Sequence, residues 1–546
     1  MTAAGSPART RIAALAGWLR DHRVFLLVAF ATLAVFPYTP AINNPNENVR
    51  VYMTRALVQH HTLDISKVEA EWGWVNDKAR NGTRVFSSKA PGASLLGVPV
   101  LAAQTFVWHR LGWHSPSQLA TTLSLRVFVV MIPMCAFLWL VCRHARRLSG
   151  SRAVGDLVMV AVGLGSLLYP YGIHFVGHGL AAAASFGAFM VLAPPPGGTC
   201  AEGHQRAAWA GLLAGLGVVF EYQNLLVAAL LTVYVAIRRP RSLPAFLAGA
   251  LPAVVILGTF HALCFGRPWA FPYGHLDNVG FQTEHHGRGF HGLGLPEASA
   301  LAGVLFLPGF GFFACSPFLV VALAAVVWMV VRGPRAEGIL LGGIAVVLTM
   351  FIAGLPNWRG GWSVGPRYIA AVVPFAAIAL AYVWPRLAHR RWIGPAWTIT
   401  AALVAVGVFL NALTAVLYPQ VPTQLRNPAF QLLLPLPLDG YLPYSLAWAL
   451  GMRGWASLVP VALAIAAAVV MVLPPPPRRQ ARVPLGRALA APAALAIALA
   501  LLVPFSRWPS HPSPAEKDAI RLVRSTWSPA PVRGAAPPAD ARGPQP

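Results

Sequence analysis

The chain has 546 residues, of which 56% are hydrophobic and 11% are charged, and its mean hydropathy is +0.59. This composition excludes an ordinary soluble globular protein and indicates a membrane protein with many spanning segments. The formal net charge of +25 would suggest nucleic acid binding in a soluble protein. Here the basic residues fall in short clusters between apolar runs, which is the positive-inside pattern, so we expect no nucleic acid partner.

The N-terminal residues 1–23 are basic and lead into a first apolar run that is followed by no small-x-small cleavage site. This arrangement predicts an uncleaved anchor with a cytoplasmic N-terminus. The five cysteines lie in or beside apolar segments without Cys-x-x-Cys spacing, which predicts packed, reduced thiols.

Apolar runs recur along residues 24–504 and predict an all-α polytopic bundle of about thirteen transmembrane helices. The expected spans are 24–39, 124–142, 153–170, 176–193, 207–219, 224–237, 243–264, 314–331, 338–355, 367–384, 396–417, 455–473 and 486–504. The basic clusters between them then all lie on the cytoplasmic side, at 142–152, 238–241, 332–335, 385–392 and 474–482.

Residues 93–108 are short for a crossing and contain Pro99 and Gln104, so we expect a shallow or re-entrant helix there. The alternative is that 93–108 crosses the membrane and that 207–237 forms one long helix. Residues 505–546 are rich in proline, alanine and arginine and are predicted to be a disordered tail.

Three long polar loops lie on the outer face in this topology, at residues 40–92, 265–299 and 418–454, and we expect the chemistry on that face. In the first loop, apolar residues recur at helical spacing after Glu47, which predicts an amphipathic helix in the membrane interface. Glu47 either complements the dipole of that helix or acts as a general base whose pKa is raised near the bilayer.

Cations that could hold a phosphate lie in two of the outer segments. Lys89 follows Ser88 and precedes a Pro-Gly turn, a donor-rich corner suited to a phosphate, although a lysine there could simply extend toward the interface. Arg359 and Arg367 flank a loop rich in tryptophan and glycine. Alone they read as membrane-edge anchors, but together with Lys89 they would supply the cations that a lipid phosphate on the outer face requires.

His174 and His178 are four residues apart and would share one face of a helix. Two histidines without an adjacent carboxylate are a weak metal signal, so no metal site is predicted and a role for a divalent cation is left open. They are candidates for binding the substrate.

Glu221 and Tyr222 separate two short apolar segments. A glutamate there is costly unless it faces a polar cavity, so we expect it to pair with an arginine or help hold a sugar. His285 and His286 lie in a glycine-rich loop that we expect to bind the acceptor.

The order of these features resembles a known family. Asn46-Glu47 follows the first span, Lys89-Ala90-Pro91 ends the amphipathic loop, and Arg367-Tyr368 precedes an apolar Pro-Phe run. This order is similar to the GT-C class of lipid-carrier-dependent glycosyltransferases (glycosyltransferase family 39-like), especially the protein O-mannosyltransferases and lipid A aminoarabinose transferases. Those enzymes typically show an Asp-Glu pair and a Lys-Pro-Pro motif, from which this chain departs at both places.

The resemblance implies that Glu47 stands where the first-loop acid acts, that Lys89 contacts the lipid phosphate and that Arg367 lies near the donor. It also implies transfer of a sugar from a polyprenyl-phosphate carrier to an acceptor hydroxyl on the outer face of the cytoplasmic (inner) membrane. The acceptor is a protein, a lipid or a glycan, which the motifs do not distinguish.

Two other functions fit parts of this pattern. A transporter or lipid flippase would also use many helices with polar residues, but such proteins often show repeated halves, and the outer loops here are unrepeated. A polysaccharide polymerase or ligase would act on pyrophosphate carriers. The chain has neither a Walker A loop nor a dinucleotide-binding glycine motif, which argues against direct energy coupling to ATP.

Overall fold

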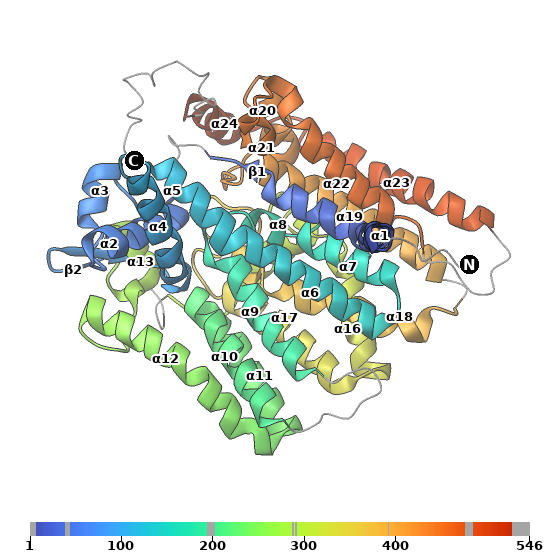
Figure 1. Ribbon diagram of the computed structural model, residues 1–546, viewed down its shortest axis with the longest axis horizontal. Coiled ribbons are helices and arrows are strands. Elements are labelled where there is room, and N and C mark those ends of the chain that lie inside the picture. The colour runs from blue at the N-terminus through green and yellow to red at the C-terminus, as the bar shows by residue number, and fades with distance from the viewer. Residues whose placement is uncertain are drawn as a thin grey trace.

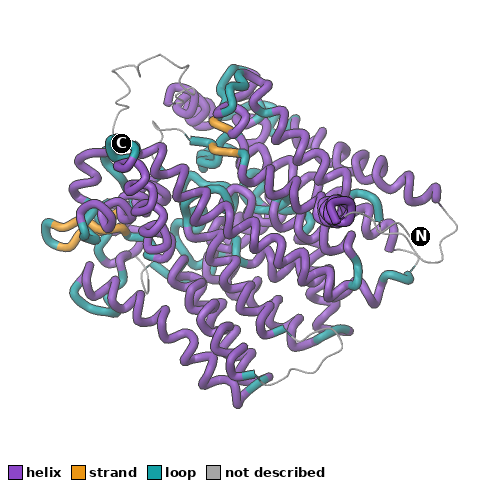
Figure 2. The backbone as a smooth tube through the Cα atoms, in the orientation of Figure 1, coloured by secondary structure: helices purple, strands orange, loops and turns teal. Residues whose placement is uncertain are grey.

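The computed structural model describes residues 7–38, 44–193, 203–286, 289, 292–390, 393–475 and 484–526. This part of the chain is mostly helical (Figures 1 and 2). The longer helices are α1 (Pro7–Leu33), α2 (Pro45–His60), α4 (Gly92–Arg110), α6 (Ile132–Ser149), α7 (Arg152–Gly163), α9 (Gly177–Leu192), α10 (His204–Phe220), α11 (Leu225–Arg238), α12 (Leu243–Phe265), α16 (Leu319–Arg332), α17 (Arg335–Ala353), α18 (Val372–Leu387), α19 (Ile393–Val416), α22 (Val459–Val472), α23 (Pro484–Ser506) and α24 (Pro514–Thr526).

Shorter elements connect these helices. The short helices are α3 (Ser66–Trp72), α5 (Gln118–Leu125), α8 (Leu168–Tyr171), α13 (Val279–His286), α14 (Ala298–Phe306), α15 (Phe312–Cys315), α20 (Pro435–Leu438) and α21 (Leu446–Ala449). Two antiparallel strand pairs complete the described structure, β1 (Val35–Phe36) with β4 (Tyr444–Ser445) and β2 (Lys78–Asn81) with β3 (Arg84–Ser87).

By length and composition, five helical segments within the described residues can cross a membrane. They are Gln118–Ser149, Pro240–Phe265, Arg335–Ala353, Ile393–Val416 and Leu489–Ser506, and shorter apolar helices accompany them. A helix suits this setting because it satisfies its own backbone hydrogen bonds where no water can. The chain is therefore an all-α, multi-pass membrane protein, as its composition predicted. Every expected span overlaps a helix, while the number of crossings stays a prediction.

The helix break expected at residues 221–224 is present. Glu221 has extended backbone angles (φ −150°, ψ 121°) between the end of α10 and a single 3₁₀ turn that leads into α11. Residues 207–237 therefore do not form one long helix. Residues 93–108 fall within α4, where Gln104 donates to the carbonyl of Ala120 (3.1 Å) and accepts from the hydroxyl of Ser124 (2.7 Å). These bonds show how the polar Gln104 is accommodated in an apolar helix.

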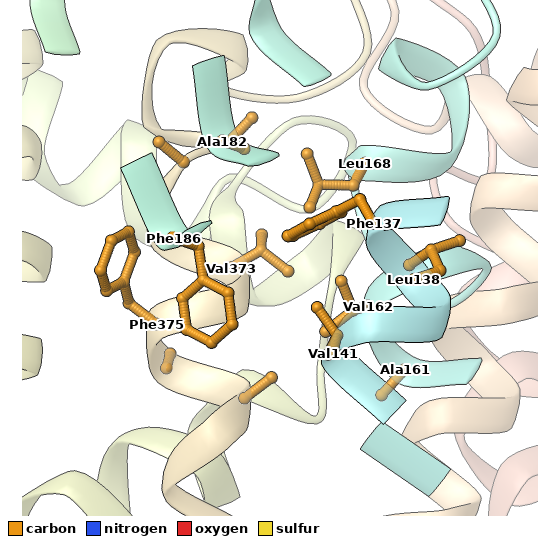
Figure 3. Close-up of a cluster of buried hydrophobic side chains, with 14 of the residues drawn as sticks. Phe137, Leu138, Val141, Ala161, Val162, Leu168, Ala182, Phe186, Val373 and Phe375 are labelled. Carbon is orange, nitrogen blue, oxygen red and sulfur yellow. The ribbon is translucent and has the colours of Figure 1, made fainter. Parts of the chain in front are cut away.

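The apolar core lies where α6, α7, α9 and α18 meet (Figure 3). Phe186 of α9 packs edge-to-face against Phe375 of α18 at 5.1 Å between ring centroids and against Phe137 of α6 at 6.2 Å. Edge-to-face pairs of this kind add roughly 0.5–1.5 kcal/mol beyond the burial of their area. This packing fixes α9, whose first turn carries His178.

The loops at residues 40–92 and 265–299 join at one end of the molecule. In Figure 1 the elements α2, α3, α4, β2 and α13 lie together at the left, opposite the N-terminus. The backbone N–H of Arg80 donates to the carbonyl of His275 (2.7 Å), and that of Asp277 donates to the carbonyl of Lys78 (3.1 Å). The Arg80 guanidinium, 2.7 Å from Asp277, lowers the pKa of that carboxyl. The hairpin β2–β3 is thus held by the loop that follows α12.

Helix α2 is buried within the protein, whereas its sequence predicted an amphipathic helix lying in the membrane interface. Its residues from Asn46 to Ala56 are buried apart from Asn48, charged side chains included. The periodicity of its apolar residues could not show this, because each buried charge is neutralised by a partner on another element: Glu47 by Arg126, Arg50 by Glu221 and Arg55 by Glu71.

The beginning of the expected disordered tail is folded. Residues 514–526 form α24, and Glu516 at its start is almost fully buried. Its carboxylate accepts from Nε and Nη2 of Arg426 (3.0 and 2.8 Å), from the Gln431 amide (2.9 Å) and from the backbone N–H of Ser513 (2.7 Å). These donors, with Arg426 first, hold the pKa of Glu516 well below its usual range. Composition suggested disorder because these partners lie far away in the sequence; residues 527–546 lie outside the described part.

We expect Glu516→Gln to release α24, because the variant removes the charge that Arg426 and the other donors surround. Hydrogen bonds to a charged group contribute about 1.5–3 kcal/mol, so trypsin should cut after Lys517, Arg521 and Arg524 roughly tenfold faster. The control is Asp518→Asn, since the Asp518 side chain is 70% exposed. Equal digestion of both variants would contradict a clamping role for Glu516.

Candidate active site

The hairpin β2–β3 places an acid beside Lys89. Its register pairs Lys78 with Ser87, so Asp77 lies opposite Ser88. The Ser88 hydroxyl and backbone N–H both donate to the carbonyl oxygen of Asp77 (2.8 and 3.3 Å). Lys89 Nζ then lies 3.1 Å from Asp77 Oδ2, and the two side chains are each 11% exposed. The hairpin therefore presents a partly desolvated lysine–aspartate pair.

The break between α10 and α11 supplies a second carboxylate. Glu221 Oε1 accepts from Nη2 of Arg50 at 2.8 Å and lies 3.5 Å from Nδ1 of His178. Gly177 passes so close that a Cβ on it would come within 2.5 Å of Glu221 Oε1, so a glycine is required there. The start of α9 can therefore bring His178 up against the broken helix.

Arg367 lies in the turn before α18, with Nη2 3.3 Å from the hydroxyl of Tyr368. Gly360 has a positive φ of 69°, and a Cβ on it would lie 3.0 Å from Arg367 Nε, so the loop can pass the guanidinium only at a glycine. Arg367 interacts electrostatically with Glu221 and with Asp77.

These elements bring together what we name the polar cluster: Arg50, Asp77, Lys89, His178, Glu221 and Arg367. Lys89 and Arg367 both interact electrostatically with Glu221 and His178. With His178 neutral, three cations face two carboxylates, which leaves one positive charge in excess. In the described structure, Nε of Arg50 and Nε of Arg367 are buried donors without a hydrogen-bond partner. A region with surplus positive charge and unsatisfied N–H groups suits an anionic ligand.

Glu47 lies apart from these residues in a closed ion pair. Its two oxygens each accept from Arg126 at 2.6 Å, and Oε1 also accepts from the backbone N–H of Phe175 at 2.8 Å. Burial raises the pKa of Glu47, but Arg126 outweighs burial and the pKa is lowered to about 2. The sequence suggested a raised pKa, which is wrong because the arginine that neutralises Glu47 comes from a distant helix. At neutral pH Glu47 is a weak proton acceptor.

The remaining predicted residues have other partners. Buried His174 contacts the carbonyl oxygen of Pro170 through Nδ1 (2.7 Å) and interacts with Glu47 and Arg126. The Tyr222 hydroxyl lies 3.1 Å from Nε2 of His261.

Two further candidates lie in connecting loops or short helices. Arg359 donates to the carbonyl oxygen of Thr423 and lies over the rings of Phe310 and Trp358. The ring of His285 stacks on Tyr273 at 4.9 Å between centroids, while the side chain of His286 lies outside the described part.

Sequence reasoning missed Arg50 and Asp77. A signal for Asp77 was present, because a two-residue loop with glycine first, Gly82-Thr83, is typical of a hairpin, and a hairpin centred there pairs Asp77 with Ser88. Arg50 had no such signal, since the sequence shows that Glu221 needs a cation but not which of the 42 lysines and arginines supplies it.

Among the described residues, no group of three or more histidine, cysteine, aspartate or glutamate side chains is arranged to hold a metal ion. A small pocket of about 30 Å³ lies beside the segment that precedes Arg367. Val364, Gly365, Leu410 and Phe505 are among its mostly apolar lining residues. An apolar recess therefore adjoins the segment that supplies one of the cations.

No protein-family model and no curated protein sequence matches the chain. Solved structures with a similar arrangement include ArnT from Cupriavidus metallidurans bound to undecaprenyl phosphate, at 14% identity and a TM-score of 0.43, over 94% of this chain and 89% of that one. The same protein in the apo state has 14% sequence identity and a TM-score of 0.42, and the match covers 94% of this chain and 90% of that one. The oligosaccharyltransferase of Archaeoglobus fulgidus has 14% sequence identity and a TM-score of 0.39, and the match covers 73% of this chain and 54% of that one.

These proteins are GT-C glycosyltransferases, the class that the sequence motifs resemble. The TM-scores all lie below 0.5, so a function for this chain has to rest on the side chains of the polar cluster.

We expect Arg126→Met to lower the free energy of unfolding by about 3–5 kcal/mol, because it leaves the Glu47 carboxylate buried without its partner. Adding Glu47→Gln should recover part of that loss, since no uncompensated charge then remains. Thermal unfolding in detergent measures both effects. Arg146→Met is the matched control, because its ion pair with Asp156 is more exposed (23% and 19%) and should contribute less. If the double variant loses as much free energy of unfolding as the two single variants added together, direct pairing of Arg126 with Glu47 is contradicted.

The ion pair also predicts how stability depends on pH. The pKa of Glu47 is lowered in the folded protein from 4.5 to about 2. The contribution of the Glu47 carboxylate to the free energy of unfolding is therefore complete above pH 4.5 and is lost as the pH falls toward 2. Unfolding temperatures measured from pH 6 to pH 3 should fall less steeply for the Glu47→Gln, Arg126→Met double variant than for the wild type. Parallel curves would contradict this assignment.

Proposed function

We propose that the polar cluster binds the phosphate of a polyprenyl-phosphate-linked sugar and that the chain transfers the sugar to an acceptor hydroxyl on the outer face of the cytoplasmic membrane. The observation that carries this proposal is the excess positive charge around Lys89 and Arg367, combined with the buried, unpartnered Nε of Arg367. A phosphate monoanion or diester would neutralise the charge and accept from the free donor.

Lys89 and Arg367 have complementary properties for this task. Lys89 already bonds Asp77, so an arriving phosphate would share or replace one carboxylate partner at little further cost of desolvation. Arg367 presents a planar group that can bond two phosphate oxygens at once. As the bond from the sugar to the phosphate breaks, negative charge grows on the departing lipid phosphate. Fixed cations in a partly dry site stabilise that charge far more than water does.

The rest of the structure suits a lipid-linked donor. The chain carries apolar helices that can cross a membrane, which suits a carrier whose isoprenoid tail stays in the bilayer. The hairpin, drawn in orange at the left of Figure 2, is hydrogen-bonded to the loop that follows α12. An acceptor would therefore approach from the outer loops while the carrier stays in the bilayer.

Lys89→Ala should lower sugar transfer about 100-fold or more, since loss of one preorganised donor to a developing anion has that effect in other enzymes. Membranes carrying the protein are incubated with a panel of radiolabelled polyprenyl-phosphate sugars, and release of the sugar is measured. Lys67→Ala is the matched control, because Lys67 is an exposed lysine of the same loop.

Arg367→Gln should show a similar loss in this assay, because the amide keeps hydrogen bonding but removes the charge. The proposal fails if the wild type consumes no donor in the panel. It also fails if Lys89→Ala and Arg367→Gln transfer sugar as fast as Lys67→Ala does.

A further inference from the structure

His178 is held in one orientation beside Glu221. Its side chain is 2% exposed, and its ring lies edge-on between Tyr171 (5.1 Å) and Tyr368 (6.1 Å). Nδ1 lies 3.5 Å from Glu221 Oε1, while the buried Nε2 on the other side of the ring has no hydrogen-bond partner in the described structure. The ring therefore has one nitrogen facing a carboxylate and one available to a ligand.

This environment selects a tautomer. A neutral imidazole carries its proton on one nitrogen and a lone pair on the other, and the partner decides which. A carboxylate accepts hydrogen bonds, so it favours the proton on Nδ1 and leaves the lone pair on Nε2. The carboxylate–histidine pairs of hydrolases work by this arrangement. The 3.5 Å separation is long, as catalytic contacts commonly are before a substrate binds.

We propose that His178 is the general base of the transfer and that Glu221 is the positioning residue that orients it. This inference rests on the proposed function and names the group that takes the acceptor proton. Three carboxylates compete for that role. Glu47 has both oxygens bonded to Arg126, and Asp77 bonds Lys89, which places it beside the leaving phosphate. Glu221 bonds Arg50 through the oxygen that also faces His178.

The acceptor O–H gives its proton to Nε2 of His178, and its oxygen forms a new bond to the anomeric carbon of the sugar. The bond from that carbon to the phosphate oxygen breaks, and its electron pair leaves with the lipid phosphate next to Lys89 and Arg367. The imidazolium that results carries protons on both nitrogens and is stabilised by Glu221. It returns the proton to water when the products leave.

His178→Ala tests the base directly. We expect kcat to fall about 100-fold or more, with the KM for the donor nearly unchanged, because the phosphate cations remain. Added imidazole should restore activity in proportion to its concentration by occupying the space of the missing ring. His144→Gln is the control, since His144 is a half-buried histidine of α6 that packs edge-to-face against Phe186 of α9.

Glu221→Gln tests the orienting role. The amide can turn an N–H toward Nδ1, which would move the imidazole proton to Nε2 and remove the base. We expect a loss in kcat of about 100-fold with no rescue by imidazole, and partial recovery in Glu221→Asp, which keeps the carboxylate. The acid limb of the pH–rate profile should be present in the wild type and absent in His178→Ala. Besides Glu221, the groups facing His178 are Arg50, Lys89, Arg367, Tyr171 and Tyr368.

The outcomes separate this inference from the proposed function. A wild type that consumes no donor overturns both. A wild type that transfers sugar while His178→Ala matches it in kcat and pH profile leaves the proposed function standing. It overturns only the assignment of His178 as general base and of Glu221 as its positioning residue. An activity loss that imidazole does not restore and that comes with a raised KM also overturns it, since that pattern indicates a role in donor binding. If His178→Ala does not fold, His178→Gln carries the same comparison of kcat and pH profile.

Discussion

The structure depends on the cost of placing charge inside an apolar helical bundle. A buried ion is tolerated only when an opposite charge and hydrogen bonds replace its water, and helix α2 carries three such ions. Glu47, Arg50 and Arg55 each find a partner on a different element. Because the pairs of Glu47 and Arg50 join α2 to distant parts of the chain, these two ion pairs fix where the loop at residues 40–92 lies. The positions of the hairpin and of Lys89 follow from that.

The Arg50–Glu221 pair shows how this constraint produces a site. Glu221 interrupts the apolar run between α10 and α11, and its extended backbone frees the carboxylate from the helix. Arg50 neutralises it from the first loop, Gly177 allows α9 to approach, and His178 arrives with it. A break that would be unfavourable in lipid is thereby stabilised by the same side chains to which we assign the chemistry.

Sequence reasoning recovered what depends on local pattern. Apolar length predicted the helices, and the polar interruption at Glu221 predicted the break between α10 and α11. It also selected Lys89, His178, Glu221 and Arg367, four residues that the structure brings together. It could not assign partners across the chain, because Arg126 lies 79 residues from Glu47 and Arg50 lies 171 from Glu221. For the same reason it suggested the wrong pKa direction for Glu47 and disorder for the segment that Glu516 anchors.

Glu47 and Glu221 are chemically identical, and their surroundings give them different capacities. Glu47 is 2% exposed and both of its oxygens are bonded to one arginine, which holds its proton affinity low. Glu221 is bonded to its arginine through one oxygen only and faces a histidine with a free nitrogen. The Glu47 pair holds elements together, whereas a carboxylate that also faces an imidazole can orient the ring and stabilise its protonated form. The difference follows from geometry: Arg126 meets Glu47 with two nitrogens, and Arg50 meets Glu221 with one.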